Sequence, residues 1–482
     1  MNYCIKNGNI VGEEKVFVGD ILIIGDKISK ISETAIEDVP EGTEIIDATG
    51  KYVLPGIIDT HVHFREPGLT HKADIESESR AAAFGGVTSY FDMPNCKPQT
   101  TDFETLAEKQ KLAAEKSHVN YAFFLGATTE NTHLFKQIDK RTTPGVKLFM
   151  GSSTGNMLVD DYKALANIFK TATDNHLLVM AHCESNDIIQ EQTKEVKKLY
   201  GDDADVSLHP IIRNREACTK SALEAFTFAK MYRTKLHIAH ISTAEEATVY
   251  PEAAEFLDLP ITFEACLPHI VFNDSDYATR GTRIKCNPAV KTAKDQQAII
   301  AAIKSGKITT IATDHAPHTW EEKQGGCLTA TSGMPMLQFS LISMLELFTD
   351  KTTNAISDED IMIISRQMSS NPATLFRVED RGLLKEGYKA DIAIVSKTDE
   401  PWTLTKADIQ SKCGWSPLEG DQFHWKVQHT FCNGNHILND GVFDPSSRGE
   451  QIIFHRRPFK EPENTKQSAW LNFSLSPNSI SS

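Results

Sequence analysis

The 482-residue sequence lacks several features that assign proteins to common classes. It contains no run of about 18 consecutive apolar residues, so we expect no membrane span. Its start, "MNYCIKNGNIVGEE", has no basic region followed by a long apolar stretch, which predicts the absence of an export signal. Nine cysteines are present but none forms a C-x-x-C pair, so we expect reduced thiols and a cytoplasmic location.

Positive charge is also scarce, because the sequence has 50 Lys and Arg residues against 65 Asp and Glu residues, which gives a net charge of −15. Nucleic acids and anionic membranes bind basic surfaces, so neither is expected as a partner. A small anionic substrate held by a local basic pocket remains compatible with this balance. The hydrophobic content of 40% and the chain length predict a soluble globular protein with a large core.

Apolar segments divide the chain into two β-rich ends and a different middle. Runs such as "YCIKNGNIV" near the N-terminus alternate with glycine-containing turns, and a similar pattern returns in "GLLKEGYKADIAIVS". In the middle, short apolar runs alternate with helical patterns such as "DYKALANIFKTATD" and "TAKDQQAIIAAIKSG". The eight runs are "VLPGIIDTHVHF", "VTSYFDMPN", "VNYAFFLGA", "GVKLFMGS", "LLVMAHCE", "LHIAHIST", "ITFEACLPH" and "ITTIATDHAPH".

Eight successive strand–helix units predict an α/β fold, a (β/α)8 TIM barrel. An open doubly wound sheet is the alternative, but no G-x-G-x-x-G motif follows the first strand. The two β-rich ends are expected to pack together as one small β-sandwich domain. We therefore expect residues 1–54 and 376–450 to form the sandwich, residues 55–375 to form the barrel, and residues 451–482 to form a tail.

Polar residues gather at the end of nearly every apolar run. In a barrel these are the C-terminal ends of the strands, where the loops converge and active sites form. Buried polar groups need partners, and clusters of histidine and carboxylate find them most often in metal ions. The residues concerned are His61, His63, Arg65, Asp92, Asn95, Lys147, His182, Glu184, His240, Asp314, His315 and His318.

Taken singly, these residues also have structural explanations. His61 and His63 share one face of a strand, so they can bind one ion or each be satisfied by hydrogen bonds. His237 and His240 cannot both point inward, and His240 is favoured because it lies nearer the strand end. Lys147 inside "GVKLFM" is expected either to form a salt bridge or to have a depressed pKa. Their convergence at one end of a barrel favours a metal site.

Together these residues resemble the amidohydrolase superfamily and, within it, the dihydroorotases. The resemblance covers nearly the whole chain, through "NPATLFRVEDRGLLKEGYKADIAIV". It implies a barrel that binds two divalent metal ions, expected to be Zn²⁺, with a β-sandwich from both chain ends. The implied metal ligands are His61 and His63 for the more buried ion, His182 and His240 for the other, Lys147 as an N6-carboxylated bridge, and Asp314.

Substrate-binding residues separate dihydroorotases from hydantoinases, dihydropyrimidinases and allantoinases, which share the metal ligands. Arg65 in "FREPG", Asn95 in "DMPN" and His318 in "TDHAPH" match the dihydroorotase positions that hold the substrate's carboxylate. A planar guanidinium suits a carboxylate, whereas ring amides without one have no use for it. The structural alternative for Arg65 is a salt bridge to Glu66 or Asp59.

Two segments depart from the dihydroorotase pattern. The usual K-x-N-P-P-L-R is "KCNPAVK" here, so Asn287 matches a substrate-contacting asparagine while Ala289 and Lys291 differ. The segment "SGMPMLQFSL" replaces the more common S-G-x-x-G-L-E. Residues 322–336, which lie beside the site, are expected to form either a mobile lid or an ordinary surface loop.

The resemblance implies reversible hydrolysis of (S)-dihydroorotate to N-carbamoyl-L-aspartate, a step of de novo pyrimidine (UMP) biosynthesis. A metal-bridging hydroxide would attack the ring amide, and Asp314 would act as general base and then as general acid. We expect a homodimer that acts on this small molecule. A cyclic amidase for hydantoin, dihydropyrimidine or allantoin is the alternative. A non-catalytic scaffold of the same fold is disfavoured, because all six implied ligands are present.

Overall fold

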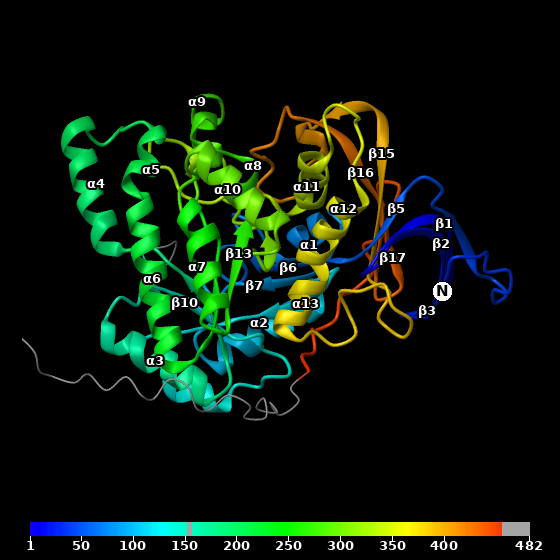
Figure 1. Cartoon of the computed structure of the whole chain (residues 1–482), viewed down its shortest axis with the longest axis horizontal. Helices are drawn as coiled ribbons and strands as arrows, with labels where there is room; N and C mark the ends of the chain where they lie inside the picture. Colours follow the sequence, from blue (N-terminus) through cyan, green and yellow to red (C-terminus); the bar gives the residue numbers. More distant parts are fainter. Residues whose placement is uncertain (152–156, 456–482) are drawn as a thin grey trace, which may run out of the picture.

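The computed structural model describes residues 1–151 and 157–455. Helices and parallel strands occupy one side of the molecule, and a mixed sheet that contains the N-terminus occupies the other (Figure 1). The expected tail lies outside the described residues except for 451–455. Within the described parts of the chain, no helix combines the length and apolar character needed to cross a bilayer.

Short parallel strands form the centre of the larger part, and each of the eight apolar runs contains one. The third run contains two, β8 and β9, which Phe124 alone separates along the chain. The strands pair in the orders β6-β7-β8 and β9-β10-β11-β12-β13-β14, and a parallel bridge between Val62 and His315 joins the first run to the last. The bounds are β6 (Ile57–Val62), β7 (Val87–Asp92), β8 (Asn120–Phe123), β9 (Leu125–Gly126), β10 (Val146–Phe149), β11 (Leu178–His182), β12 (Lys235–Ile238), β13 (Ile261–Cys266) and β14 (Thr310–Ala312).

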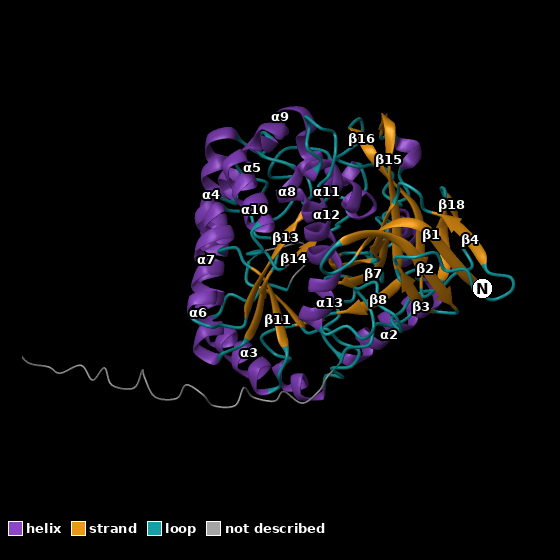
Figure 2. Ribbon diagram, turned by 45° about the vertical axis from the view of Figure 1, so that its right-hand side comes forward, coloured by secondary structure: helices purple, strands orange, loops and turns teal. Residues whose placement is uncertain are grey.

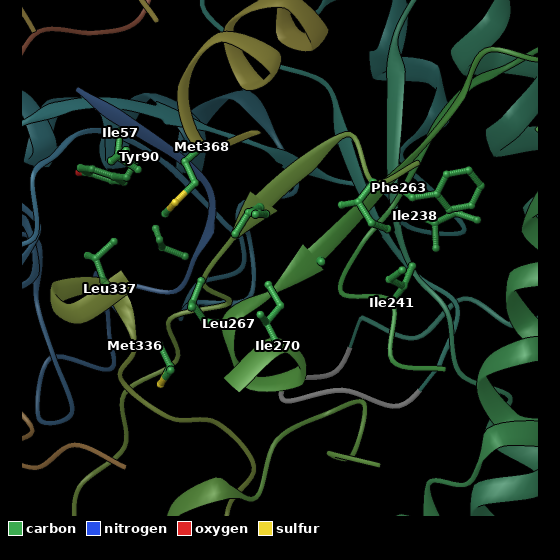
Figure 3. Packing of buried hydrophobic residues seen from close by; sticks show 14 of the residues in the cluster. Ile57, Tyr90, Ile238, Ile241, Phe263, Leu267, Ile270, Met336, Leu337 and Met368 are labelled. Atoms are coloured by element: carbon green, nitrogen blue, oxygen red, sulfur yellow. The ribbon is translucent and has the colours of Figure 1, made fainter. Parts of the chain in front are cut away.

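These strands are almost entirely buried, which explains why they read as continuous apolar runs rather than as alternating patterns. Ile238 on β12 is paired with Phe263 on β13, and both lie in the large apolar cluster that surrounds the strands (Figure 3). Because the strands are parallel, their carboxyl ends open on one side of the molecule. The polar residues that end the runs therefore converge.

Helices cover the outside of these strands (Figure 2). Local sequence fixes their starts: Asp161 accepts a hydrogen bond from the Ala164 N–H, and Thr292 and Asp295 form a capping box. The two helices expected from the apolar spacing are α3 and α10. The bounds are α1 (Ile75–Phe84), α2 (Phe103–Lys116), α3 (Tyr162–Asp174), α4 (Asn186–Tyr200), α5 (His209–Ile212), α6 (Arg215–Tyr232), α7 (Ala244–Phe256), α8 (Leu267–Val271), α9 (Tyr277–Arg280), α10 (Ala293–Lys304), α11 (Ser340–Phe348), α12 (Asp358–Ser365) and α13 (Asn371–Phe376).

The two ends of the chain join in one mixed sheet of nine strands. Val53 on β5 pairs with Ile10 on one side and with Ile394 on the other, so strands from both chain ends belong to one hydrogen-bonded sheet. The sandwich arrangement and the domain bounds stay predictions. The order is β18 (Val442–Phe443), β17 (Asn435–Asn439), β16 (Gln422–Cys432), β15 (Ile392–Thr403), β5 (Tyr52–Pro55), β1 (Asn2–Val11), β2 (Val16–Ile24) and β3 (Lys27–Ser32), with β4 (Glu44–Asp47) paired to β1.

The last described residues return from this sheet to the parallel strands. The Tyr121 N–H donates to the Glu450 carbonyl at 3.0 Å, and the Phe454 N–H donates to the Arg141 carbonyl at 2.9 Å. At Gly449 a Cβ atom would lie 1.9 Å from the Val119 carbonyl oxygen, so only glycine permits this close approach. The end of the described chain thus fastens the mixed sheet to the parallel strands.

Candidate active site

Three predicted metal ligands meet where the first and last parallel strands end. The Nε2 atoms of His61 and His63 lie 3.4 and 3.0 Å from Asp314 Oδ1, and all three side chains are buried or nearly so. Asp314 has a φ of +48°, and His240, which lies nearby, has a φ of +38°. Non-glycine residues rarely adopt this conformation, and its presence at two predicted ligands indicates a backbone shaped for a site.

The second group of predicted ligands lies directly beside the first. Lys147 Nζ, which is fully buried, lies 3.5 Å from His61 Nε2. His182 Nδ1 lies 2.9 Å from His240 Nε2, and the His240 ring centroid is 5.3 Å from that of His61. All six predicted ligands therefore belong to one continuous cluster.

The hydrogen bonds behind two of these rings leave the Nε2 atom of each ring facing the cluster. His61 Nδ1 donates to Glu264 Oε1 and His63 Nδ1 donates to Asn95 Oδ1, both at 2.7 Å. Each ring then presents an unprotonated Nε2 to the centre of the cluster. The Nδ1 atom of His240 is buried and has no hydrogen-bond partner among the described residues. Nitrogen and carboxylate donors gathered in this way fit divalent metal ions.

Glu264 on β13 is the residue of this site that the sequence interpretation missed. Its carboxylate is fully buried, accepts from His61 and also accepts from the His240 backbone N–H at 3.2 Å. It thereby connects the two groups of ligands. The signal was a lone acid inside the apolar run "ITFEACLPH", a position where an unpaired carboxylate is costly.

A second buried carboxylate supports the other group. Glu184 Oε2 lies 3.0 Å from His182 Nε2 and forms a salt bridge with Arg213. Burial opposes ionisation of Glu184, but Arg213 and His182 outweigh it and hold its pKa at about 2. His237, by contrast, contacts the hydroxyls of Thr262 and Thr310 at 2.8 and 3.2 Å, as expected for a structural histidine.

The predicted substrate residues Arg65 and His318 lie against each other. Arg65 is buried, its Nε donates to the Pro317 carbonyl at 3.0 Å, and one of its terminal nitrogens lies 3.1 Å from His318 Nε2. Within the described residues no carboxylate lies within 4.0 Å of the guanidinium nitrogens. Burial lowers the pKa of Arg65 to about 10, and nearby carboxylates such as Asp314 oppose the shift only in part.

Asn95 and Asn287 occupy different surroundings. Asn95 contacts the predicted ligand His63 and so lies at the metal cluster. Asn287 Oδ1 lies 3.2 Å from Nε2 of His209, which also contacts the Cys286 carbonyl at 2.9 Å. No contact joins Asn287 to Arg65 or His318 in the described structure, so its role in substrate binding stays a prediction.

The loop at residues 322–336 is fastened to its surroundings. Lys323 is fully buried and donates to the carbonyls of Lys285, Thr331 and Gly333 at 2.8–3.1 Å. The Cys327 N–H donates to the Ala204 carbonyl at 2.8 Å. The structure thus shows a closed arrangement, and opening of this loop as a lid stays a prediction.

Comparison with known proteins agrees with this arrangement. The sequence model of the amidohydrolase family matches residues 52–437, which contain every residue of the cluster. This chain belongs to the amidohydrolase family. Among curated amidohydrolases, a dihydroorotase of Methanosphaera stadtmanae is 29% identical over 449 residues, covering 91% of this chain and 97% of the relative. An allantoinase of Bacillus velezensis is 30% identical over 439 residues, covering 90% and 92%.

Solved amidohydrolase structures share the fold, a TIM-type barrel with an additional domain. The L-hydantoinase (dihydropyrimidinase) of Arthrobacter aurescens superposes with a TM-score of 0.87 at 24% identity, over 94% of this chain and 99% of that one. The dihydropyrimidinase of Brevibacillus agri gives 0.85 at 22% identity, over 95% and 100%. At identities below 25% this structural similarity shows the fold alone.

The electrostatics of the cluster fit an amidohydrolase centre, whose family typically binds divalent metals. Burial would raise the pKa of Asp314, but His61, His63 and Lys147 outweigh it and bring that pKa to about 2. Burial lowers the pKa of Lys147 from its usual value, against the opposing effect of Glu264 and Asp314. The carboxylate is therefore ionised at neutral pH, as a metal ligand must be.

Proposed function

We propose that this amidohydrolase is a dihydroorotase, which opens the ring of (S)-dihydroorotate to N-carbamoyl-L-aspartate and catalyses the reverse reaction in pyrimidine biosynthesis. The single observation that carries the proposal is Arg65: a buried guanidinium whose hydrogen-bond contacts are the Pro317 carbonyl and the neutral ring of His318. Carboxylates such as Asp314 lie near enough to act on Arg65, but none within the described residues forms an ion pair with it. A buried charge without a direct ion pair is costly, so we infer that an anionic ligand is its partner. Among cyclic amides, dihydroorotate supplies that carboxylate.

The structural alternative for Arg65 finds no support in the contacts. Glu66 forms a salt bridge with Lys116 and accepts from the Ile75 N–H at 3.0 Å. Asp59 accepts from the Thr313 hydroxyl at 2.6 Å. Both acids expected as structural partners of Arg65 are therefore engaged elsewhere, and the one contact of its terminal nitrogens is with the His318 ring. This supports a ligand as the charged partner of Arg65.

The cluster supports the proposed ligand roles. His61, His63, His182 and His240, together with Asp314 and Lys147, would hold two ions, for which we propose Zn²⁺. Bound ions of this kind lower the pKa of water and polarise a carbonyl oxygen. Lys147 has no carboxylate within ion-pair distance in the described structure, so conversion to the N6-carboxylate would remove a costly buried ammonium.

Asp314 is the proposed proton-transfer residue. Its carboxylate lies at the centre of the cluster and is ionised, so it can accept a proton from the attacking water and return it to the leaving ring nitrogen. Arg65, with His318 beside it and Asn95 close to the cluster, would fix the substrate's carboxylate and so orient the amide bond.

The second candidate is a cyclic amidase for an uncharged ring, such as hydantoin, dihydrouracil or allantoin. The allantoinase of Bacillus velezensis favours it, because that relative is as similar to this chain as the dihydroorotases are. Both candidates use the same metal ligands. They differ in whether the substrate carries a carboxylate.

Assays of ring opening on a panel of cyclic amides test the proposal. The zinc-loaded protein is assayed with dihydroorotate, dihydrouracil, hydantoin and allantoin, and its metal content is measured by plasma emission. Dihydroorotate should be the best substrate by a wide margin, with about two ions per chain. Preference for any of the three uncharged rings would show that the second candidate is right. Full metal content without turnover of any ring would contradict both.

A further inference from the structure

Lys72 lies beside the proposed carboxylate pocket, in the segment between β6 and α1. It is buried, and its Nζ lies 3.2 Å from His318 Nδ1 and 3.0 Å from Glu322 Oε1. Glu322 Oε2 itself lies 3.3 Å from His318 Nδ1. The ring of His318 therefore has a lysine and a carboxylate at one nitrogen.

The other nitrogen of His318 also has two neighbours of opposite character. Nε2 lies 3.1 Å from a terminal nitrogen of Arg65, which can only donate, and 3.0 Å from the Ser332 carbonyl, which can only accept. Burial and the cations Arg65, Lys72 and Lys323 hold the pKa of His318 well below its usual value. The ring is accordingly neutral and carries one proton.

A neutral ring can satisfy these neighbours in only two ways. With the proton on Nε2, His318 donates to the Ser332 carbonyl and accepts from Lys72, and the nearby Arg65 donor stays unused. With the proton on Nδ1, His318 donates to Glu322 and accepts from Arg65, which ties up that donor. The two tautomers thus differ in whether Arg65 is available to a ligand.

We infer that Lys72 is a positioning residue, which selects the tautomer of His318 that carries its proton on Nε2. In that state both Arg65 and His318 can donate to the substrate's carboxylate. The His318 Nε2–H group then changes its hydrogen-bond acceptor from the Ser332 carbonyl to the ligand. Glu322 favours the opposite tautomer. The inference rests on the proposed function, since it concerns how the same pocket recognises a carboxylate.

Two substitutions in one ion pair should therefore have different effects. Lys72→Met removes the donor to Nδ1 and lets Glu322 hold the unproductive tautomer, so binding of a carboxylate should weaken by about tenfold or more. Glu322→Gln removes the competing carboxylate and should leave that binding unchanged or slightly stronger. If Lys72 and Glu322 acted only as a salt bridge that holds the loop, both changes would weaken binding to the same degree.

The probes are orotate and uracil, which differ by one carboxylate and are tested as competitive inhibitors of the metal-loaded protein. Lys72→Met should raise the inhibition constant of orotate and the KM for dihydroorotate, with little change in kcat or in the constant for uracil. Lys72→Arg, which retains a donor, should restore most of the preference for orotate. Lys198→Met is the control, because the Lys198 side chain is 74% exposed on α4.

The outcomes separate the inference from the function on which it rests. If the unaltered protein binds orotate no better than uracil, the proposed function is wrong. If it prefers orotate and Lys72→Met keeps that preference, Lys72 does not position His318. Equal losses in Lys72→Met and Glu322→Gln would likewise overturn the inference, because they would indicate a salt bridge alone.

Discussion

Replacement of Arg65 by methionine tests whether the proposed substrate site recognises a carboxylate. Methionine is apolar and matches the aliphatic stem of arginine, so the change removes the guanidinium and leaves a smaller gap than alanine would. Arg65 has a φ of +68°, and methionine adopts this conformation no more easily than arginine, so the backbone strain is the same in both proteins. The loss of the Nε hydrogen bond to the Pro317 carbonyl is the structural cost.

The magnitude follows from the burial of the guanidinium. Each hydrogen bond from a charged donor contributes about 1.5–3 kcal/mol, and loss of one partner of a buried charge pair costs about 2–5 kcal/mol. A loss of about 3–4 kcal/mol for the carboxylated substrate corresponds to a fall in kcat/KM of about 10²- to 10³-fold. Dihydrouracil lacks the carboxylate, so its binding should change by less than about fivefold.

Ring opening of dihydroorotate and binding of dihydrouracil are measured side by side on both proteins. Metal content and thermal unfolding show whether Arg65→Met is folded and loaded. Arg141→Met serves as the control, because the Arg141 side chain is 67% exposed and lies outside the site. Equal effects of Arg65→Met on the two rings would refute the reasoning, because Arg65 would then be structural.

Three further changes test other parts of the molecule. Asp314→Asn should abolish turnover and leave metal content nearly intact; loss of metal with activity retained would contradict its role in proton transfer. Glu264→Gln should weaken metal binding by about 10- to 100-fold in a chelator competition, because it holds His61 in the correct tautomer; unchanged affinity would contradict this. Asp20→Asn tests the mixed sheet, in which Asp20 accepts from the Asn7 and Ile36 N–H groups, both at 2.9 Å. Burial would raise the pKa of Asp20, but these two bonds and the nearby Lys6 outweigh it and hold that pKa below 3.8. The carboxylate therefore stabilises the fold above about pH 3.8, and this stabilisation is lost as the pH falls through the folded-state pKa of Asp20. At pH 7 the variant should lose about 1–3 kcal/mol of unfolding free energy, and the difference in urea midpoint between the two proteins should narrow near pH 3. A gap that does not change with pH would show that the carboxylate charge is irrelevant.

The sequence predicted the parallel strands well because burial on both faces leaves a direct mark. A strand covered on both sides is apolar throughout, and turn residues punctuate it, so all eight runs could be located. The starts of α3 and α10 were equally visible, since a capping residue such as Asp161 or Thr292 acts on a backbone N–H only three residues away. Local chemistry was sufficient in both cases.

Contacts between distant parts of the chain were not visible in this way. Glu264 supports His61 across 203 residues, and Lys72 contacts His318 across 246. Neither pair has a spacing that a periodic pattern could reveal. The strand order of the mixed sheet was not visible for the same reason, because Val53 on β5 pairs with Ile10 near the start of the chain and with Ile394 near its end.

Overall similarity cannot choose the substrate of this amidohydrolase, because a dihydroorotase and an allantoinase are equally close to it. The proposed metal ligands cannot choose either, since the chemistry that they would support serves any cyclic amide. A choice requires a group whose energy depends on the substrate's charge. Arg65 is such a group: its buried guanidinium is stabilised by an anion and gains nothing from a neutral ring. Lys72 matters for the same reason: by favouring the His318 tautomer that carries its proton on Nε2, it leaves the guanidinium of Arg65 able to donate to the substrate rather than to His318.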